Sequence, residues 1–345
     1  MPSSKQSGIL PWLRLLRIPN LPSAISNILM GFLLINQSWS MSVPLVLLIF
    51  ASSAMYLAGM VLNDAFDYEI DLAQRPHRPL PAGEITITSA WIVGFGLLIS
   101  GVVLACVAGW AGSSGGHDGV TSPVWRTAVI ASMLAIGIVL YDGPLKRTLA
   151  APFVMGFCRG LNILLGASTF SPSATAAMPT QASGLFADNL LFGLPLIIWW
   201  VAISISGLIA GATLLGRKEA HASQKRGPLL IAGLIMLFSL IALASIVYCP
   251  TESTQFSFKI SESQKTVFPL FIGIMSLTII RRAVEAIVTA KPKAIQIGVV
   301  SVLRSLIIFD AAVCYLAAPH QIAYALVVLA LLIPTLFLGR FIAST

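Results

Sequence analysis

The residues best suited to chemistry lie between Asn63 and Asp71, in the segment NDAFDYEID. An α-helix turns about 100° per residue, so Asp67, Asp71 and Asp64 point about 40°, 80° and 100° from Asn63, while Glu69 points roughly opposite. Carboxylates on one stripe repel each other unless a cation neutralises them, and Mg²⁺ commonly joins one or two carboxylates to a substrate's phosphates. The stripe therefore predicts a Mg²⁺ site; the alternative is a solvated acidic helix end.

A proline-rich segment follows directly, from Arg75 to Gly83, and reads RPHRPLPAG. Its prolines and its glycine predict an ordered turn rather than a helix. Arg75 and Arg78 would then lie beside the carboxylates, where a phosphate-bearing ligand could bridge a metal ion and the guanidinium groups. The alternative is that both arginines set the membrane topology and pair with the aspartates.

Arg159 is an ionisable residue inside an apolar segment, and Asn162 follows about one helical turn later on the same face. A charge inside the bilayer costs about 2.5–3.5 kcal/mol, so such a residue points to function. The flanking Gly156 and Gly160 would let neighbouring helices approach closely. Arg159 either faces a cavity and stabilises its polar end, or it is a structural partner for another helix.

The composition indicates which elements position these residues. Of the 345 residues, 57% are hydrophobic and 10% are charged, against about 25% charged in soluble domains. A bilayer is the simplest solvent for such a chain, so membrane lipid is an expected partner. The formal net charge is +8, but the basic residues form short clusters between apolar runs rather than one stripe, which argues against nucleic acid.

Apolar stretches of about 20 residues, the length that crosses a bilayer, are found near 20–36, 43–66, 87–111, 124–142, 150–170, 189–215, 228–249, 266–286, 295–317 and 321–341. Nine spans is the competing interpretation, because the first stretch is short and the eighth and ninth carry charges. Ten spans place most Lys and Arg residues on one side, and cytoplasmic loops are enriched in these residues. The sequence thus predicts one all-α domain over 1–345, a polytopic bundle of nine to ten membrane helices. Both termini and the acidic site would lie on the cytoplasmic side of the cell membrane.

Several motifs resemble those of a known family. The pattern Asn-Asp-x-x-Asp-x-x-x-Asp at 63–71, followed by Arg-Pro-x-Arg-Pro-Leu-Pro-x-Gly at 75–83, is similar to the first aspartate-rich motif of the UbiA superfamily of intramembrane prenyltransferases. The segments RIPN at 17–20 and YDGPLKRT at 141–148 are also similar to that family. The resemblance covers the chain to about residue 230, and its nearest subgroup is the UbiA-like proteins called EboC.

The resemblance implies a helical bundle around a central cavity that opens laterally to lipid. An isoprenyl diphosphate would place its headgroup at the cytoplasmic end and its tail in the cavity, and no motif identifies the acceptor. Together with the reasoning above, it assigns Asn63, Asp64, Asp67 and Asp71 to Mg²⁺, Asp64, Asp67 and Tyr141 to catalysis, and Asn20, Arg75, Arg78, Lys146, Arg147 and Arg159 to the diphosphate. Tyr141 would lie near the allylic carbon, although the family commonly has one fewer residue between this tyrosine and the lysine.

The family's second aspartate-rich motif, between the sixth and seventh spans, has no counterpart here. This chain has GRKEAHASQKR at 216–226, with Glu219 as its one acid. Either basic residues hold the diphosphate in place of a second Mg²⁺, or the protein is a non-catalytic carrier that binds or moves a lipid or metabolite. An ion-coupled transporter is a third interpretation, but transporter sites usually lie near the bilayer midplane. His221 is interpreted as a loop residue.

Overall fold

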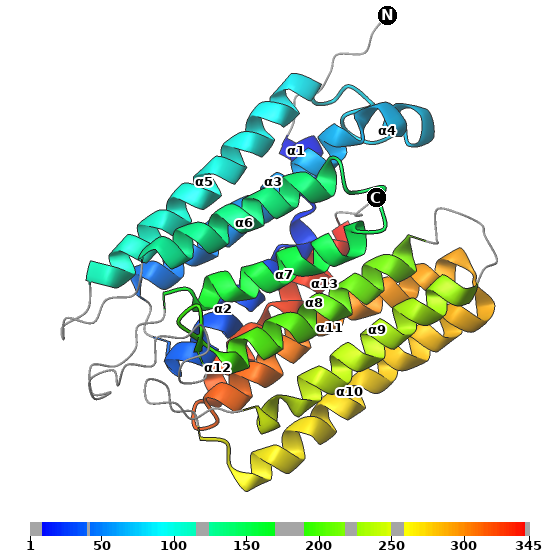
Figure 1. Ribbon diagram of the computed structural model, residues 1–345. Helices are drawn as coiled ribbons and strands as arrows, with labels where there is room; N and C mark the ends of the chain where they lie inside the picture. The colour runs from blue at the N-terminus through cyan, green and yellow to red at the C-terminus, as the bar shows by residue number, and fades with distance from the viewer. Residues whose placement is uncertain are drawn as a thin grey trace, which may run out of the picture.

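The computed structural model describes residues 9–39, 42–114, 124–169, 190–217, 226–249 and 259–341, and most of these residues are helical (Figure 1). In chain order the elements are α1 (Ile9–Leu15), η1 (Ile18–Asn20), α2 (Pro22–Asn36), α3 (Val43–Phe66), α4 (Tyr68–Gln74), α5 (Ile87–Ser114), α6 (Val124–Asp142), α7 (Ala151–Ala167), β1 (Leu190–Leu191), β2 (Leu194–Pro195), α8 (Leu196–Gly216), α9 (Arg226–Ala244), η3 (Ser245–Tyr248), α10 (Glu262–Thr289), α11 (Pro292–Ala317), α12 (Ile322–Ala330) and α13 (Leu332–Phe341).

The predicted membrane spans correspond to helices in the described part of the chain. Eight helical segments are long and apolar enough to cross a membrane. Two shorter apolar segments, Ala151–Ala167 and Ile322–Leu338, take the places of the fifth and tenth predicted spans. Helices α3 and α6 begin and end at the predicted residues. The all-α membrane bundle is therefore confirmed.

The sixth predicted span, 189–215, is wrong at its start. Strands β1 and β2 form a short antiparallel hairpin, and α8 begins only at Leu196. Gly193 in the hairpin turn has a φ of 68°, a left-handed conformation that glycine adopts readily. Arg126 of α6 is buried and donates to the Gly193 carbonyl oxygen at 2.9 Å. The hairpin thus replaces the first turns of the predicted helix.

The tenth predicted span, 321–341, is two helices rather than one. Helix α12 ends at Ala330, and α13 begins at Leu332. Pro334 lies four residues after Ala330. A proline ring clashes with the carbonyl group four residues before it and removes one helical hydrogen bond. The break therefore follows from Pro334.

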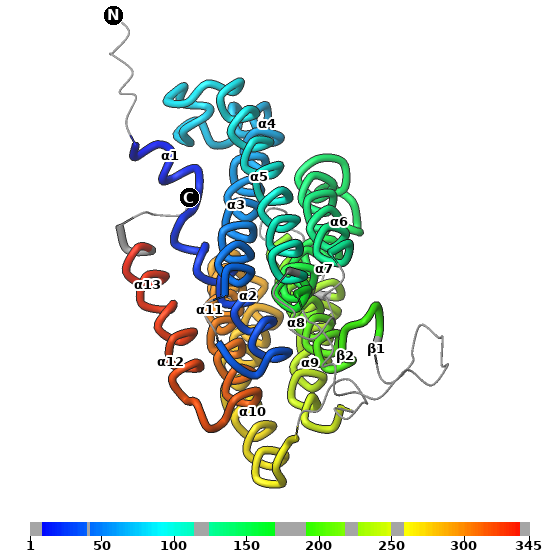
Figure 2. The backbone as a smooth tube through the Cα atoms, turned by 90° about the vertical axis from the view of Figure 1, so that its left-hand side faces the viewer, coloured from blue at the N-terminus to red at the C-terminus, as the bar shows by residue number. Residues whose placement is uncertain are grey.

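The helices pack as a bundle in which α2, α7, α8 and α11 form a central group (Figures 1 and 2). Helix α5 packs on α3 and α6, while α9 and α10 pack on the opposite flank. A Cβ atom on Gly156 of α7 would lie 2.2 Å from the Ser206 carbonyl oxygen of α8, and one on Gly160 would lie 2.3 Å from Ser206 Oγ. The close helix approach predicted from these glycines is confirmed.

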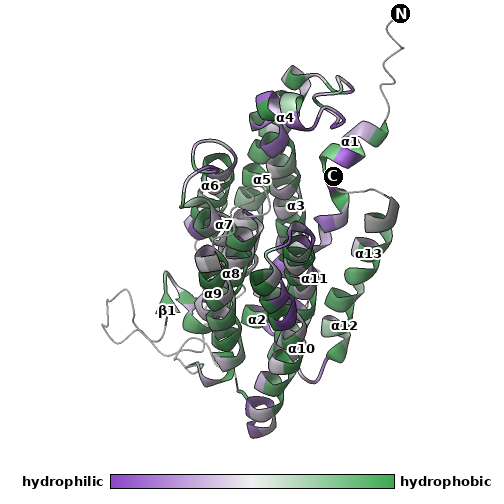
Figure 3. Cartoon of the chain, turned by 90° about the vertical axis from the view of Figure 1, so that its right-hand side faces the viewer, coloured by the Kyte–Doolittle hydropathy of each residue, from purple (hydrophilic) through white to green (hydrophobic). Residues whose placement is uncertain are grey.

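The surface of the bundle is apolar along the helices and polar at one end. Hydrophobic residues cover most of its length, and hydrophilic residues gather around α1 and α4 (Figure 3). Large apolar side chains face outward, such as Ile92 (69% exposed) and Leu270 (63% exposed), and extended apolar surface of this kind marks contact with a membrane. Helix α1 and the end of α13 lie toward the same end as α4 (Figure 2), as an even number of crossings requires.

Candidate active site

The acidic segment is not one continuous helix. Helix α3 ends at Phe66 and α4 begins at Tyr68, with Asp67 at the junction. Helical hydrogen bonds nevertheless continue, because the Asp67 amide donates to the Asn63 carbonyl oxygen at 3.2 Å and the Asp71 amide donates to the Asp67 carbonyl oxygen at 2.9 Å. The predicted single helix is therefore wrong at Asp67, while the helical spacing of its polar side chains is largely kept.

Arginines neutralise the two ends of this segment. Arg78 Nη1 lies 2.6 Å from Asp71 Oδ2 and 3.5 Å from Asp64 Oδ1, and Arg17 Nη2 lies 2.8 Å from Asp64 Oδ1. Asp64, Asp71 and Arg78 are all buried, and burial strengthens such pairs relative to pairs in water. Arg75 is exposed and lies 3.6 Å from Asp71. Both arginines of the proline-rich segment thus lie beside the carboxylates, as predicted.

The turn that holds Arg78 has its own hydrogen bonds. The Ala82 amide donates to the Arg78 carbonyl oxygen at 2.9 Å, and the Glu84 amide donates to the Pro79 carbonyl oxygen at 3.0 Å. Gly83 has a φ of 71°, which a side chain would disfavour. The ordered turn predicted from the prolines and the glycine is confirmed, and it fixes Arg78 against the acidic segment.

Lys146 reaches the middle of the acidic segment from the connection between α6 and α7. Its Nζ lies 2.5 Å from Asp67 Oδ2 and 2.6 Å from Asn63 Oδ1. Arg217, at the end of α8, donates to the Lys146 carbonyl oxygen at 3.3 Å. Arg147 is exposed, and within the described residues no ion pair joins it to the acidic segment. Lys146 is therefore the cation that this connection supplies.

We call this group the polar cluster: Asn63, Asp64, Asp67 and Asp71 with Arg17, Arg78 and Lys146. In the described parts of the chain, no three acidic, histidine or cysteine side chains could hold a metal ion together. Oxygen atoms of Asn63 and Asp67 instead converge on the Lys146 ammonium. Mg²⁺ prefers carboxylate and carbonyl oxygens and completes its shell with water and phosphate. The Asn63 and Asp67 oxygens therefore fit part of the shell of a Mg²⁺ ion that takes its other ligands from a substrate, whereas Asp64 and Asp71 are paired with Arg17 and Arg78 and do not complete the predicted four-residue site.

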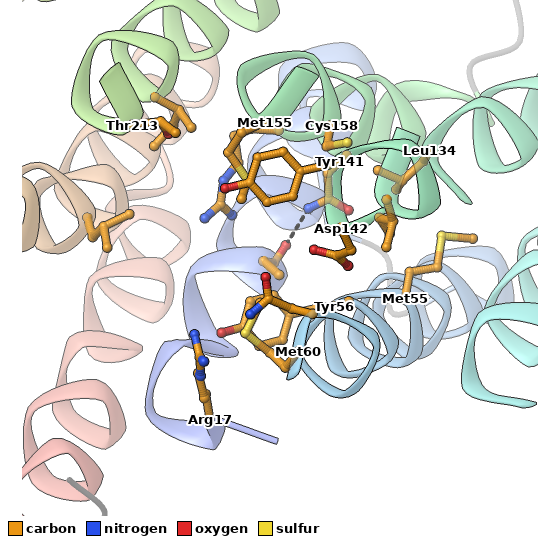
Figure 4. Close-up of a pocket in the computed structure, with 18 of the residues that line it drawn as sticks. Arg17, Met55, Tyr56, Met60, Leu134, Tyr141, Asp142, Met155, Cys158 and Thr213 are labelled. Atoms are coloured by element: carbon orange, nitrogen blue, oxygen red, sulfur yellow. Dashed lines mark hydrogen bonds between the residues drawn. The ribbon is translucent and has the colours of Figure 1, made fainter. Parts of the chain in front are cut away.

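A cavity of about 310 Å³ adjoins the polar cluster and lies between α2, α3, α6, α7, α8 and α11 (Figure 4). Its volume is at the lower end of the range of about 300–1,000 Å³ for ligand pockets. Arg17 and Asn63 belong both to the cluster and to the cavity wall. About two helical turns away from the cluster, the wall is apolar and includes Met55 and Leu134. The predicted central cavity is present.

Two predicted residues lie outside the cluster, and one of them lies in the wall of this cavity. Tyr141 of α6 lines the cavity (Figure 4). Asn20 forms a side-chain hydrogen bond with Tyr56 of α3, which also lines the cavity. Within the described residues neither forms an ion pair or hydrogen bond with the carboxylates of the cluster. Their assigned roles stay predictions.

Arg159 lines the cavity, and helix α2 holds its guanidinium group. Its Nη1 donates to the Ser23 carbonyl oxygen at 3.0 Å and to Asn27 Oδ1 at 2.8 Å. Asn162 also binds α2, by donating to the Ala24 carbonyl oxygen at 3.0 Å. Arg159 thus lines the cavity and is also a partner of another helix, while its predicted role in stabilising the polar end of the cavity stays a prediction. Its assignment to the diphosphate stays a prediction.

Sequence reasoning did not assign Arg17, Asp142 or Arg217 to the site. The two arginines carried a usable signal, because each belongs to a basic cluster on the predicted cytoplasmic side. Asp142 is next to Tyr141 in the segment 141–148, and that position is the signal in the sequence that could identify it. Glu219 and His221 lie outside the described residues.

Comparison with known proteins identifies the class. A model of the UbiA prenyltransferase family matches residues 24–248, which is more than half of the chain. The chain therefore belongs to the UbiA prenyltransferase family, as its motifs predicted.

The chain is also similar in sequence to curated relatives that carry a specific name. The digeranylgeranylglyceryl phosphate synthase of Saccharolobus solfataricus is 31% identical over 138 residues, which is 40% of this chain and 43% of that protein. The protein of the same name from Methanococcoides burtonii is 30% identical over 179 residues, which is 48% of this chain and 57% of that protein. The chain thus spans about half the length of the curated relatives it matches.

Solved structures share the fold over nearly the whole chain. A UbiA homolog from Archaeoglobus fulgidus, bound to GPP and Mg²⁺, has a TM-score of 0.57 at 15% identity and covers 93% of this chain and 99% of its own. A UbiA homolog from Aeropyrum pernix, solved in its apo form, has a TM-score of 0.55 at 15% identity and covers 85% of this chain and 96% of its own. At these identities the likeness shows the fold alone, and it agrees with the predicted bundle.

Proposed function

We propose that the protein is a Mg²⁺-dependent prenyltransferase that moves an isoprenyl group from an isoprenyl diphosphate to an acceptor. One observation carries the proposal: Arg17 and Asn63 lie both in the polar cluster and in the wall of the apolar cavity. A diphosphate bound at the cluster would therefore direct its isoprenyl tail into the cavity. An isoprenyl diphosphate has this division into a charged headgroup and an apolar chain.

The polar cluster contains the groups that such a headgroup needs. The oxygen atoms of Asn63 and Asp67, which converge on the Lys146 ammonium, would hold Mg²⁺, which supplies charge neutralisation on the diphosphate when bound. The three cations of the cluster each lie within 3.5 Å of a carboxylate oxygen. The same cations would bind phosphate oxygens, for which guanidinium and ammonium groups are suitable donors. The solved homolog from Archaeoglobus fulgidus, which binds GPP and Mg²⁺, supports this choice of ligands.

The proposed reaction breaks the allylic carbon–oxygen bond, and negative charge collects on the leaving diphosphate. The cations of the cluster would stabilise that charge more in the transition state than in the ground state, which accelerates the step. Tyr141 and the apolar wall would shield the developing allylic cation from water. The acceptor then forms the new bond to the allylic carbon.

Turnover by purified protein tests the proposal. The protein in detergent would be mixed with Mg²⁺, isoprenyl diphosphates of several lengths and two kinds of acceptor, an alkylglyceryl phosphate and a phenol. The names of the curated relatives make the glyceryl compound the first choice. We expect diphosphate release that falls about 10²–10³-fold in Asp67→Asn, the usual loss when one electrostatic group is removed. Glu285→Gln, which changes an exposed carboxylate paired with Arg282 on α10, is the matched control.

The alternative function, a non-catalytic carrier, makes a different prediction for the same assay. A carrier would bind the isoprenyl diphosphate in a Mg²⁺-dependent way without releasing diphosphate. The family to which the chain belongs favours the transferase. Absence of any Mg²⁺-dependent binding would contradict both functions.

We further propose that the polar cluster faces the cytoplasm of a cell membrane. Loops rich in Lys and Arg remain on the cytoplasmic side, and Lys146 and Arg147 lie in such a connection. Leu149 in the same connection is 88% exposed. We expect a Leu149→Cys variant to react with an impermeant thiol reagent in inside-out vesicles and not in right-side-out vesicles, with the unchanged protein giving the background. The reverse labelling pattern would contradict this orientation.

A further inference from the structure

Asp142 is a buried carboxylate in the cavity that the roles proposed above leave unused. It is the last residue of α6, it is 5% exposed, and it lines the cavity next to Tyr141. Figure 4 shows its carboxylate directed into the space between Tyr141 and Tyr56 of α3. Its Oδ2 atom is buried and has no hydrogen-bond partner among the described residues. Asp142 thus offers an unused acceptor at the cavity.

The neighbouring acids are arranged differently. Each carboxylate of the polar cluster has a cation close by, with Arg17 at 2.8 Å from Asp64, Lys146 at 2.5 Å from Asp67 and Arg78 at 2.6 Å from Asp71. In the described parts of the chain no ion pair reaches Asp142. A buried carboxylate oxygen without a donor is unfavourable for folding. A group retained at such a cost is best explained by a donor that arrives with a ligand.

The position of Asp142 defines which ligand can supply that donor. Asn63 and Arg17 place the polar cluster at the same cavity, so a diphosphate headgroup would lie toward the cluster. The diphosphate has acceptor oxygens and no donor for a carboxylate when it is fully ionised. The isoprenyl chain has no polar group. The remaining partner is the second substrate, and a hydroxyl group is the donor that must lose its proton when its oxygen is prenylated.

We propose that Asp142 accepts the proton of an acceptor hydroxyl during prenyl transfer, a role that rests on the proposed function. The bond between the allylic carbon and the diphosphate oxygen breaks, and its electron pair leaves with the diphosphate. A lone pair of the acceptor oxygen forms the new carbon–oxygen bond, and the hydroxyl proton moves to the Asp142 carboxylate. The products are an ether and diphosphate, and the proton later passes from Asp142 to water.

The proposed step requires an acceptor whose hydroxyl loses its proton as its oxygen is prenylated. A phenol, an alkylglycerol and an alkylglyceryl phosphate all carry such a group. Their O-methyl ethers keep nearly the same shape but lack the proton. Wild-type protein should therefore prenylate at least one hydroxyl compound and none of the ethers.

Asp142→Asn tests the role because it keeps the shape of the side chain and one oxygen but cannot serve as a comparable base. We expect kcat to fall about 10²–10⁴-fold, the usual contribution of a general base, while Mg²⁺-dependent binding of an isoprenyl thiodiphosphate stays within about twofold. Glu285→Gln, on the outer surface of α10, is the matched carboxylate-to-amide control and should keep the wild-type kcat. If the variant folds poorly, Asp142→Glu and Asp142→Gln, which match each other in size, replace it. The Glu variant should then be the faster of the two.

The outcomes separate this role from the proposed function. Wild-type turnover together with an unchanged kcat in Asp142→Asn would overturn the role of Asp142 and leave the transferase intact. Loss of thiodiphosphate binding in step with turnover would also overturn it, since that result indicates a part in the headgroup site. Equal rates for the Asp142→Glu and Asp142→Gln variants would also overturn the role of Asp142. A wild-type protein that prenylates nothing would contradict the proposed function itself.

Discussion

Removal of the Lys146 ammonium should weaken the binding of an isoprenyl diphosphate and strengthen the binding of Mg²⁺ alone. Its Nζ donates to Asp67 at 2.5 Å and to Asn63 at 2.6 Å, so in the ligand-free protein it occupies oxygens that we assign to Mg²⁺. The Lys146 side chain is 24% exposed and that of Asp67 is 16% exposed. Hydrogen bonds to charged groups contribute about 1.5–3 kcal/mol each, and partial solvent screening favours the lower end of that range.

Lys146→Met should therefore have two effects of opposite sign. The affinity for an isoprenyl thiodiphosphate should fall about tenfold, because the site loses one phosphate-binding cation that contributes about 1.5 kcal/mol. In the absence of diphosphate, Mg²⁺ should bind more tightly, because the ammonium no longer competes for the oxygens of Asp67 and Asn63. Two bonds to the ammonium no longer have to be broken, and at about 1.5 kcal/mol each we expect the Mg²⁺ affinity to rise by about a hundredfold.

Isothermal titration calorimetry of the protein in detergent measures both affinities, first with Mg²⁺ alone and then with the thiodiphosphate at saturating Mg²⁺. Lys265→Met is the matched control, since Lys265 pairs with Glu262 at 2.8 Å on α10 and does not line the cavity. It should change neither affinity. Weaker Mg²⁺ binding in Lys146→Met would refute the reasoning, because it would mean that the lysine supports the metal site instead of competing with it.

Other changes test the packing and the remaining contacts of the site. Arg17→Gln, which removes the partner at 2.8 Å from Asp64, should weaken thiodiphosphate binding about tenfold in the same titration. Gly156→Ala would place a Cβ 2.2 Å from a backbone oxygen of α8 and should lower stability by about 1–3 kcal/mol. Gly96→Ala, whose Cβ meets nothing within 4 Å, should not destabilise the protein, and thermal unfolding in detergent compares the two. Asp310→Asn removes a fully buried carboxylate that accepts hydrogen bonds from α2 at 2.5 and 2.8 Å. It should cost about 1–3 kcal/mol of stability and leave thiodiphosphate affinity unchanged.

The sequence was sufficient for the bundle and for the centre of the site because the relevant signals are local. Hydropathy over about 20 residues locates a membrane helix, and α3 and α6 have the predicted bounds. The acids at 63–71 and the arginines at 75–78 are close in sequence, so one turn is enough to bring them together. The Arg78 contacts with Asp71 and Asp64 follow from that short connection.

Contacts between distant segments could not be predicted in the same way. Arg17 and Asp64 are 47 residues apart, and only the packing of η1 and α2 against α3 brings them together. Tyr56 is one apolar-facing side chain among many on α3, and nothing in its neighbours marks it as a cavity residue. The helix break at Asp67 also lacks a proline or glycine signal. Pro334, in contrast, did carry the signal for the break between α12 and α13, and the single span of 321–341 overlooked it.

Arg217 bears on the missing second acidic motif. The segment 216–226 has four cations and one acid, and Arg217 at its start already contacts the carbonyl oxygen of Lys146 at 3.3 Å. In the polar cluster three carboxylates are balanced by three cations, so a second Mg²⁺ would need acids that the described residues do not place there. Cations of this segment could instead bind phosphate oxygens directly, which neutralises the leaving group as a second metal ion would. A non-catalytic carrier would need no second acidic motif, but it would also have no need for four basic residues in that segment, so we propose a transferase that works with one metal ion.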